Sequence, residues 1–120
     1  MVIRILLAQL PYALQEILAD TLSSQPDMVV RRVGNHMEML LAARETQADV
    51  VIIGMEDVQP PGVVSHLLDE DPSLKVILVD IDDQRGFLHE LRPELRPIGQ
   101  VTSPQLPSII RTATRGREGA

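Results

Sequence analysis

The stretch Val50-Val51-Ile52-Ile53-Gly54 decides the fold, because its four consecutive aliphatic residues leave no polar face. A strand that is apolar on both faces must be covered by helices on both sides, as the strands of a parallel sheet are. Val76-Ile77-Leu78-Val79 has the same character. Further aliphatic or β-branched runs occupy residues 2–8, 28–33 and, more weakly, 98–101. We therefore predict five strands.

Stretches with helical periodicity alternate with these runs. The apolar residues of each stretch share one face of a helix: Leu14, Ile17, Leu18 and Leu22; Met37, Leu40 and Leu41; Val64, Leu67 and Leu68; Phe87, Leu88 and Leu91; and Leu106, Ile109, Ile110 and Ala113. Strands that alternate with helices form right-handed crossovers, which place helices on both faces of one sheet. The pattern predicts a doubly wound parallel α/β domain with five strands and five helices.

Boundary residues support this division. Asn35 followed by Glu38 predicts a capping box at the start of the second helix. Asp82 or Asp83 can cap the fourth helix. Pro107 would remove an early hydrogen bond if the last helix began at Ser103-Pro104, so we expect that helix to begin about one turn later.

Composition bounds the function classes. The chain has 120 residues, 44% of them apolar and 23% charged, which fits one globular domain; we assign residues 1–114 to it and 115–120 to a polar C-terminal tail. The absence of cysteine excludes disulfides, thiolate metal sites and cysteine nucleophiles. Tyr12 and Phe87 are the only aromatic residues, which disfavours flavin and single-stranded nucleic acid as ligands.

Charge and hydropathy point to a cytoplasmic protein. The net charge of −6 disfavours broad contact with nucleic acid or anionic lipid. The apolar runs are too short to span a bilayer, and the first residues lack the layout of a secretory signal. We expect a cytoplasmic location.

Six stretches carry the framework of the chain: Ile3-Arg4-Ile5-Leu6-Leu7-Ala8; Pro26-Asp27-Met28-Val29-Val30; Ala48-Asp49-Val50-Val51-Ile52-Ile53; Pro60-Pro61-Gly62; Lys75-Val76-Ile77-Leu78-Val79; and Ser103-Pro104. Together they resemble the receiver domain of bacterial two-component response regulators over nearly the whole chain. The resemblance implies a flavodoxin-like sheet with strand order 2-1-3-4-5. It also implies a site at the carboxyl ends of the strands.

The residues that carry receiver chemistry are missing from this site. Receivers accept a phosphoryl group on an aspartate that ends the third strand, and two acidic residues after the first strand hold Mg²⁺ beside it. A Ser or Thr, a Lys and an aromatic residue stabilise or report the modification. The resemblance places these roles, in that order, on Gly54, Gln9 and Leu10, Asp80, Gln100 and Pro97. Because none of the six keeps the required residue type, we predict a pseudo-receiver that is not an enzyme.

Three alternatives concern the altered site. In the first, Asp80 or Asp57 accepts a phosphoryl group, but neither has the acidic pair that would hold a metal against the phosphoryl charge. In the second, Gln9, Asp80 and Gln100 form a hydrogen-bonded plug that holds one conformation, or else these side chains point into water. In the third, the emptied pocket holds a small molecule.

The resemblance also suggests an interaction surface. Receivers commonly dimerise through the fourth helix, fifth strand and fifth helix. The residues that this surface would offer are Phe87, Leu91, Arg92, Leu95, Ile109 and Arg111. We expect a signalling or transcription-regulating module that acts through protein contacts, as a homodimer or with another signalling protein. We expect no membrane contact and no direct nucleic-acid contact, although a longer relative could carry a DNA-binding module.

Other candidate sites are weaker. His66 and Glu70 lie one helical turn apart and could clip a metal, but two ligands do not make a site. A flavodoxin reading needs a hydroxyl- or glycine-rich phosphate loop after the first strand, where this chain has Gln9-Leu10-Pro11-Tyr12. We expect no metal and no cofactor.

Overall fold

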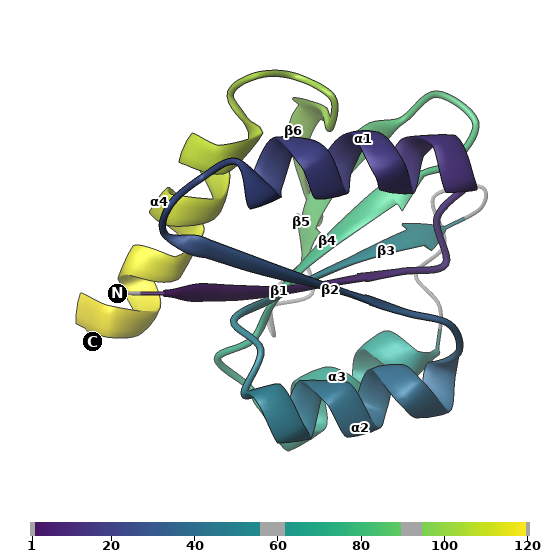
Figure 1. The fold of residues 1–120 in the computed structure, drawn as a ribbon. Coiled ribbons are helices and arrows are strands. Elements are labelled where there is room, and N and C mark those ends of the chain that lie inside the picture. The colour runs from purple at the N-terminus through teal and green to yellow at the C-terminus, as the bar shows by residue number, and fades with distance from the viewer. Residues whose placement is uncertain (1, 56–61, 90–94, 120) are drawn as a thin grey trace.

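The computed structural model describes residues 2–55, 62–89 and 95–119, which form one six-stranded sheet with helices on both faces (Figure 1). The strands are β1 (Ile3–Ala8), β2 (Met28–Val33), β3 (Val50–Met55), β4 (Lys75–Asp80), β5 (Arg85–His89) and β6 (Leu95–Gln100). The helices are α1 (Tyr12–Ser23), α2 (His36–Thr46), α3 (Val63–Glu70) and α4 (Leu106–Gly119). Figure 1 shows α1 and α4 on one face of the sheet and α2 and α3 on the other. The predicted flavodoxin-like α/β fold is confirmed.

The order of the strands differs from the prediction at one end of the sheet. The order is β2-β1-β3-β4-β5-β6, in which the first four strands are parallel neighbours. Strand β5 runs antiparallel to both β4 and β6. The predicted fifth strand corresponds to β6, so it lies one position farther out. Because neighbouring strands are about 4.8 Å apart, β6 lies roughly 10 Å from β4 instead of beside it.

The predicted fourth helix is wrong, because Phe87 and Leu88 lie in strand β5. Successive side chains of a strand point to opposite faces, and these two enter the two different cores of the domain. Gly86 allows β5 to pack closely, since a Cβ there would lie 2.6 Å from Cγ1 of Val101. Glycine also costs a helix interior about 1 kcal/mol relative to alanine. Leu91, the third member of the predicted helix face, lies outside the described residues.

A tight turn over residues 81–84 stands where that helix was predicted to start. The main-chain N–H of Gln84, whose φ is 60°, donates to the carbonyl of Asp80 at 2.7 Å. Oδ1 of Asp80 accepts from the N–H of Asp82 at 3.0 Å, and Oδ1 of Asp83 accepts from the N–H of Arg85 at 3.0 Å. The predicted helix cap at Asp82 or Asp83 is therefore wrong, because these aspartates belong to a hairpin turn.

Two other boundary predictions are confirmed. The side chain of Asn35 accepts from the N–H of Glu38 at 2.8 Å, and the Glu38 carboxylate accepts from the N–H of Gly34 at 2.7 Å. Helix α4 begins at Leu106, after Ser103-Pro104, as the position of Pro107 predicts. The helix continues to Gly119, through residues that we predicted to be a polar tail.

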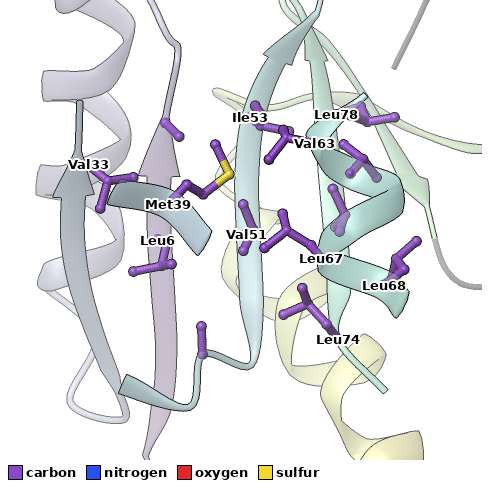
Figure 2. Close-up of a cluster of buried hydrophobic side chains, with 14 of the residues drawn as sticks. Leu6, Val33, Met39, Val51, Ile53, Val63, Leu67, Leu68, Leu74 and Leu78 are labelled. Atoms are coloured by element: carbon purple, nitrogen blue, oxygen red, sulfur yellow. The ribbon is translucent and has the colours of Figure 1, made fainter. Parts of the chain in front are cut away.

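Two apolar cores lie on opposite faces of the sheet. Alternate residues of each central strand supply them, so that Leu6 enters the core under α2 and α3 while Leu7 enters the core under α1 and α4. Figure 2 shows the first core, in which Met39 of α2 and Leu67 of α3 meet Val51 of β3. Burying one such side chain contributes about 1.5–3 kcal/mol. None of the helices in the described residues is both long and apolar enough to cross a membrane.

Candidate functional site

The carboxyl edge of the sheet, where we predicted the site, is closed by main chain at Gly54. Strands β1 and β3 pair with Ala8 opposite Ile53, so Gln9 comes beside Gly54. Gln9 has a left-handed backbone with a φ of 58°. A Cβ on Gly54 would lie less than 3.0 Å from the carbonyl oxygen of Gln9, closer than Cβ atoms come to their neighbours in proteins. Since a main-chain carbonyl cannot swing aside as a side chain can, any side chain at position 54 would require the backbone to shift.

Asp80 serves the turn that follows β4. The residue is 9% exposed, and its carboxylate accepts from the N–H of Asp82 within the turn. The main-chain N–H of Ile81, the residue after Asp80, donates to the carbonyl of Met55 at 3.2 Å and ties the turn to the end of β3. The Ile81 side chain also faces Gly54, because its Cγ2 would lie 3.0 Å from a Cβ there. Asp80 thus fixes the turn that packs over Gly54.

The predicted plug of Gln9, Asp80 and Gln100 does not form. Gln100 pairs with Arg85 of β5, one strand away from β4, because β5 is inserted between β4 and β6. Both glutamines are exposed. Among the hydrogen bonds of the described residues, none joins either glutamine to Asp80. Gln9 and Gln100 are exposed to water, as the second form of this alternative predicts. The buried Asp80 instead accepts a hydrogen bond within its own turn.

Leu10 packs against a core, and Pro97 lies on the edge strand of the sheet. Leu10 is partly buried against the core under α1 and α4. Pro97 is exposed on β6, opposite Phe87 of β5. Because β6 is the last strand of the sheet, a proline there need not interrupt hydrogen bonding to a further strand. Neither side chain carries an atom that could ligate a metal.

The His66 and Glu70 pair lies on the exposed side of α3. The Glu70 carboxylate accepts from the Arg44 guanidinium at 2.7 Å, which links α3 to α2. Within residues 2–55, 62–89 and 95–119, no group of three or more His, Asp or Glu residues is placed to hold a metal ion. Asp57, the other alternative acceptor, lies outside the described residues.

The predicted interaction surface is in part interior. Phe87 is 7% exposed and packs in the core under α2 and α3, so its ring is not offered to a partner. Ile109 is half-buried on α4. Leu91, Arg92 and the side chain of Leu95 lie outside the described part of the chain. The side of the domain that we predicted as an interaction surface is built differently, because residues 85–89 form strand β5 and not a helix.

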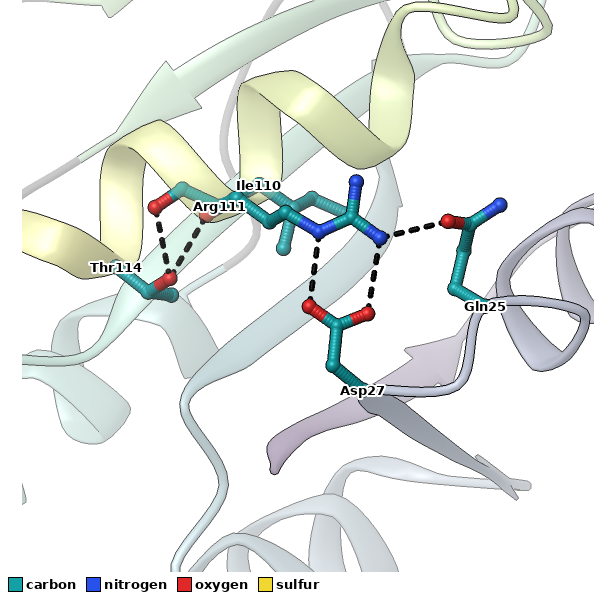
Figure 3. A network of polar contacts seen from close by, with 5 residues as sticks. All are labelled: Gln25, Asp27, Ile110, Arg111 and Thr114. Carbon is teal, nitrogen blue, oxygen red and sulfur yellow. Dashed lines mark hydrogen bonds and ion pairs between the residues drawn. The ribbon is translucent and has the colours of Figure 1, made fainter. Parts of the chain in front are cut away.

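Arg111, which we predicted to face a partner, binds within the chain (Figure 3). Its Nε donates to Oδ2 of Asp27 at 2.8 Å, and its Nη2 donates to Oδ1 of Asp27 at 2.9 Å and to Oε1 of Gln25 at 2.6 Å. This bidentate contact ties α4 to the loop between α1 and β2. The hydrogen bond from Arg111 lowers the pKa of the Asp27 carboxyl, and the same hydrogen bond raises the pKa of Arg111.

Two grooves lie away from the carboxyl edge, and we did not predict either. One, of about 580 Å³, lies between α2 and α3 and includes the paired Arg44 and Glu70 in its lining. The other, of about 330 Å³, lies between the end of α2 and the strands β1 and β2, and its lining includes Arg4 and Arg31. The sequence signal for the second groove is that Arg4 interrupts the aliphatic β1 and that Arg31 lies on the same face of β2 as Val29.

Comparisons with known proteins bear on the fold. No protein-family model matches this chain, and no curated protein matches it. Among solved structures, the chain is similar to the crystal structure of the response regulator domain of CheB from Thermotoga maritima, with a TM-score of 0.64 and 24% sequence identity. The similarity covers 96% of this chain and 98% of that chain. The chain therefore has a receiver-like fold.

Proposed function

We propose that this chain is a pseudo-receiver, a signalling or regulatory module that is not phosphorylated and works through protein contacts. The observation that carries the proposal is the closure at Gly54. The residue that would accept a phosphoryl group has no side chain, and the carbonyl of Gln9 occupies the space where one would begin. A binding role, and not catalysis, is what such an edge supports.

The chemistry of phosphoryl transfer supports the same proposal. Transfer to a carboxylate needs a nucleophile aligned with the phosphorus atom and a cation that neutralises the developing charge. Gly54 supplies no nucleophile, and Leu10 supplies no ligand for a cation. The carboxylate of Asp80, which ends β4, is buried and accepts a hydrogen bond within its own turn.

Intact-mass spectrometry after incubation with acetyl phosphate and Mg²⁺ tests the proposal. A receiver that retains its aspartate, treated in parallel, shows that the reagent is active. We expect no phosphoryl adduct on this chain. An adduct that disappears in Asp80→Asn, or that maps to Asp57, would overturn the proposal in favour of an atypical, phosphorylated receiver.

Self-association is the second part of the proposal. Its support is the resemblance to receivers, which commonly pair through the side of the domain that carries β5, β6 and α4 in this chain. Analytical ultracentrifugation over a wide concentration range measures it directly. We expect a homodimer. A monomer at the highest concentration would remove this part and leave a partner of a different sequence as the protein contact.

A further inference from the structure

Most of the arginines with described side chains form an ion pair with a carboxylate, and two do not. Six arginines have described side chains, and four of them contact a carboxylate within 4.0 Å: Arg32 with Glu16, Arg44 with Glu70, Arg85 with Asp83 and Arg111 with Asp27. Within the described residues, Arg4 and Arg31 have no such contact. The chain carries 17 acidic residues against 11 basic ones, so carboxylates are not scarce.

The two unpaired arginines lie together in the groove of about 330 Å³. Arg4 of β1 stands opposite Val29 of β2, and Leu6 of β1 stands opposite Arg31 of β2. Arg4 and Arg31 are therefore diagonal neighbours on one face of the sheet, with main chains roughly 8 Å apart. At this spacing, two long side chains can reach a single group between them.

The groove also has an apolar wall and an acidic wall. Val29 is 55% exposed beside the two arginines, which is unusual for a valine in a strand of this sheet. Glu45 and Thr46, from the last turn of α2, line the other side with Gln47. The Glu45 carboxylate and the negative end of the α2 dipole both oppose an anion. A ligand with one charged group suits this balance better than a polyanion such as nucleic acid.

We propose that this groove binds a small amphipathic anion, with its phosphate or carboxylate held between Arg4 and Arg31 and its apolar part against Val29. Guanidinium groups form charge-assisted, bidentate hydrogen bonds with these anions. Strand β2 lies at the edge of the sheet, and α2 does not cover Val29, so the groove is open to a ligand from solvent. The proposal does not depend on the proposed function, because the groove lies away from Gly54.

An NMR titration tests this site with n-butyl phosphate and inorganic phosphate as probes. We expect the amide signals of Val29 to Arg31 and of Gln47 to shift, with n-butyl phosphate binding severalfold more tightly than phosphate because its chain covers Val29. Each arginine contributes roughly tenfold in affinity, so the double variant Arg4→Gln/Arg31→Gln should lose almost all binding. Removing the opposing charge with Glu45→Gln should strengthen binding.

Arg32→Gln is the matched control, because Arg32 neighbours Arg31 in sequence, points to the opposite face of β2 and is paired with Glu16. We expect this variant to bind n-butyl phosphate with unchanged affinity. Thermal unfolding of every variant checks that the fold is kept, as expected for exposed side chains. Equal loss of binding in Arg32→Gln, or binding that survives loss of both groove arginines, would overturn the proposal. So would binding of an acidic peptide without any binding of n-butyl phosphate, since a peptide partner would then occupy the groove.

Discussion

Replacing Gly54 with alanine tests whether the main chain of Gln9 closes the carboxyl edge of the sheet. Two effects oppose each other in this variant. Alanine is favoured over glycine in a strand by about 0.5–1 kcal/mol, because glycine loses more conformational freedom on folding. Against this, the new Cβ would overlap the Gln9 carbonyl, and overpacking of a well-packed site costs about 1–3 kcal/mol. The clash is with the main chain of the residue that directly follows β1, and not with a flexible side chain, so we take the upper end of that range.

The expected net loss is about 2 kcal/mol, which corresponds to a fall in Tm of about 6–12 °C for a domain of this size. Urea and thermal unfolding monitored by circular dichroism measure both quantities. Gly62→Ala is the matched control, because a Cβ at Gly62 would meet nothing within 4 Å, and we expect it to change stability by less than about 0.5 kcal/mol. Gly54→Asp should be destabilised as well, and should remain unmodified by acetyl phosphate. A Gly54→Ala variant as stable as the parent would refute the reasoning, since it would mean that the edge is open.

Three further variants test other parts of the structure. Asp27→Asn should lower stability at pH 7, and the difference in Tm from the parent should shrink as the pH falls below about 4, because the pKa of Asp27 is depressed in the folded state and its contribution is lost as the carboxylate of the parent is protonated. A difference in Tm that stays constant down to pH 2 would contradict the role of the Arg111 contact. Asn35→Ala should cost about 1 kcal/mol in urea unfolding, because it removes the cap of α2. Phe87→Ala should cost about 3–5 kcal/mol if the ring is a core group, whereas a nearly neutral effect in the same assay would place it on the surface.

The central strands were predictable because they are apolar on both faces. A run such as Val50-Val51-Ile52-Ile53 cannot present a polar face as a helix or as a strand, and its short length between turn residues favours the strand. The same ambiguity explains the failure at Phe87 and Leu88. Together with Leu91, Phe87 and Leu88 fit one face of a helix. They fit a strand equally well, with one side chain in each of the two cores. The close approach of Val101 to Gly86 decides between these possibilities, and that approach depends on tertiary structure.

The altered site was only half predictable for a similar reason. Residue types alone showed that Gly54 and Leu10 lack the groups that phosphoryl transfer needs. The closure of the edge depends on the left-handed backbone of Gln9, and a glutamine gives no sequence signal for that conformation. The Arg111 contact was hidden because its partner, Asp27, is 84 residues away in the chain. Charged residues on a predicted surface therefore cannot be assigned to a partner before their intramolecular contacts are known.

The inserted strand and the closed edge act together. In the predicted arrangement, the last strand would bring Gln100 beside the end of β4, and so next to the side of the domain that we propose to pair with a partner. In the structure, β5 separates the two strands, and Asp80 and Gln84 fix the turn that joins β4 to β5. The carbonyl oxygen of Gln9 occupies the space that a side chain at position 54 would need. Gly54 therefore has no side chain that could be modified, and hydrogen bonds within the chain hold the turn that follows β4. These features support the proposal that the chain works through contacts on its outer surfaces, and the groove at Arg4 and Arg31 is the first place to test for a ligand.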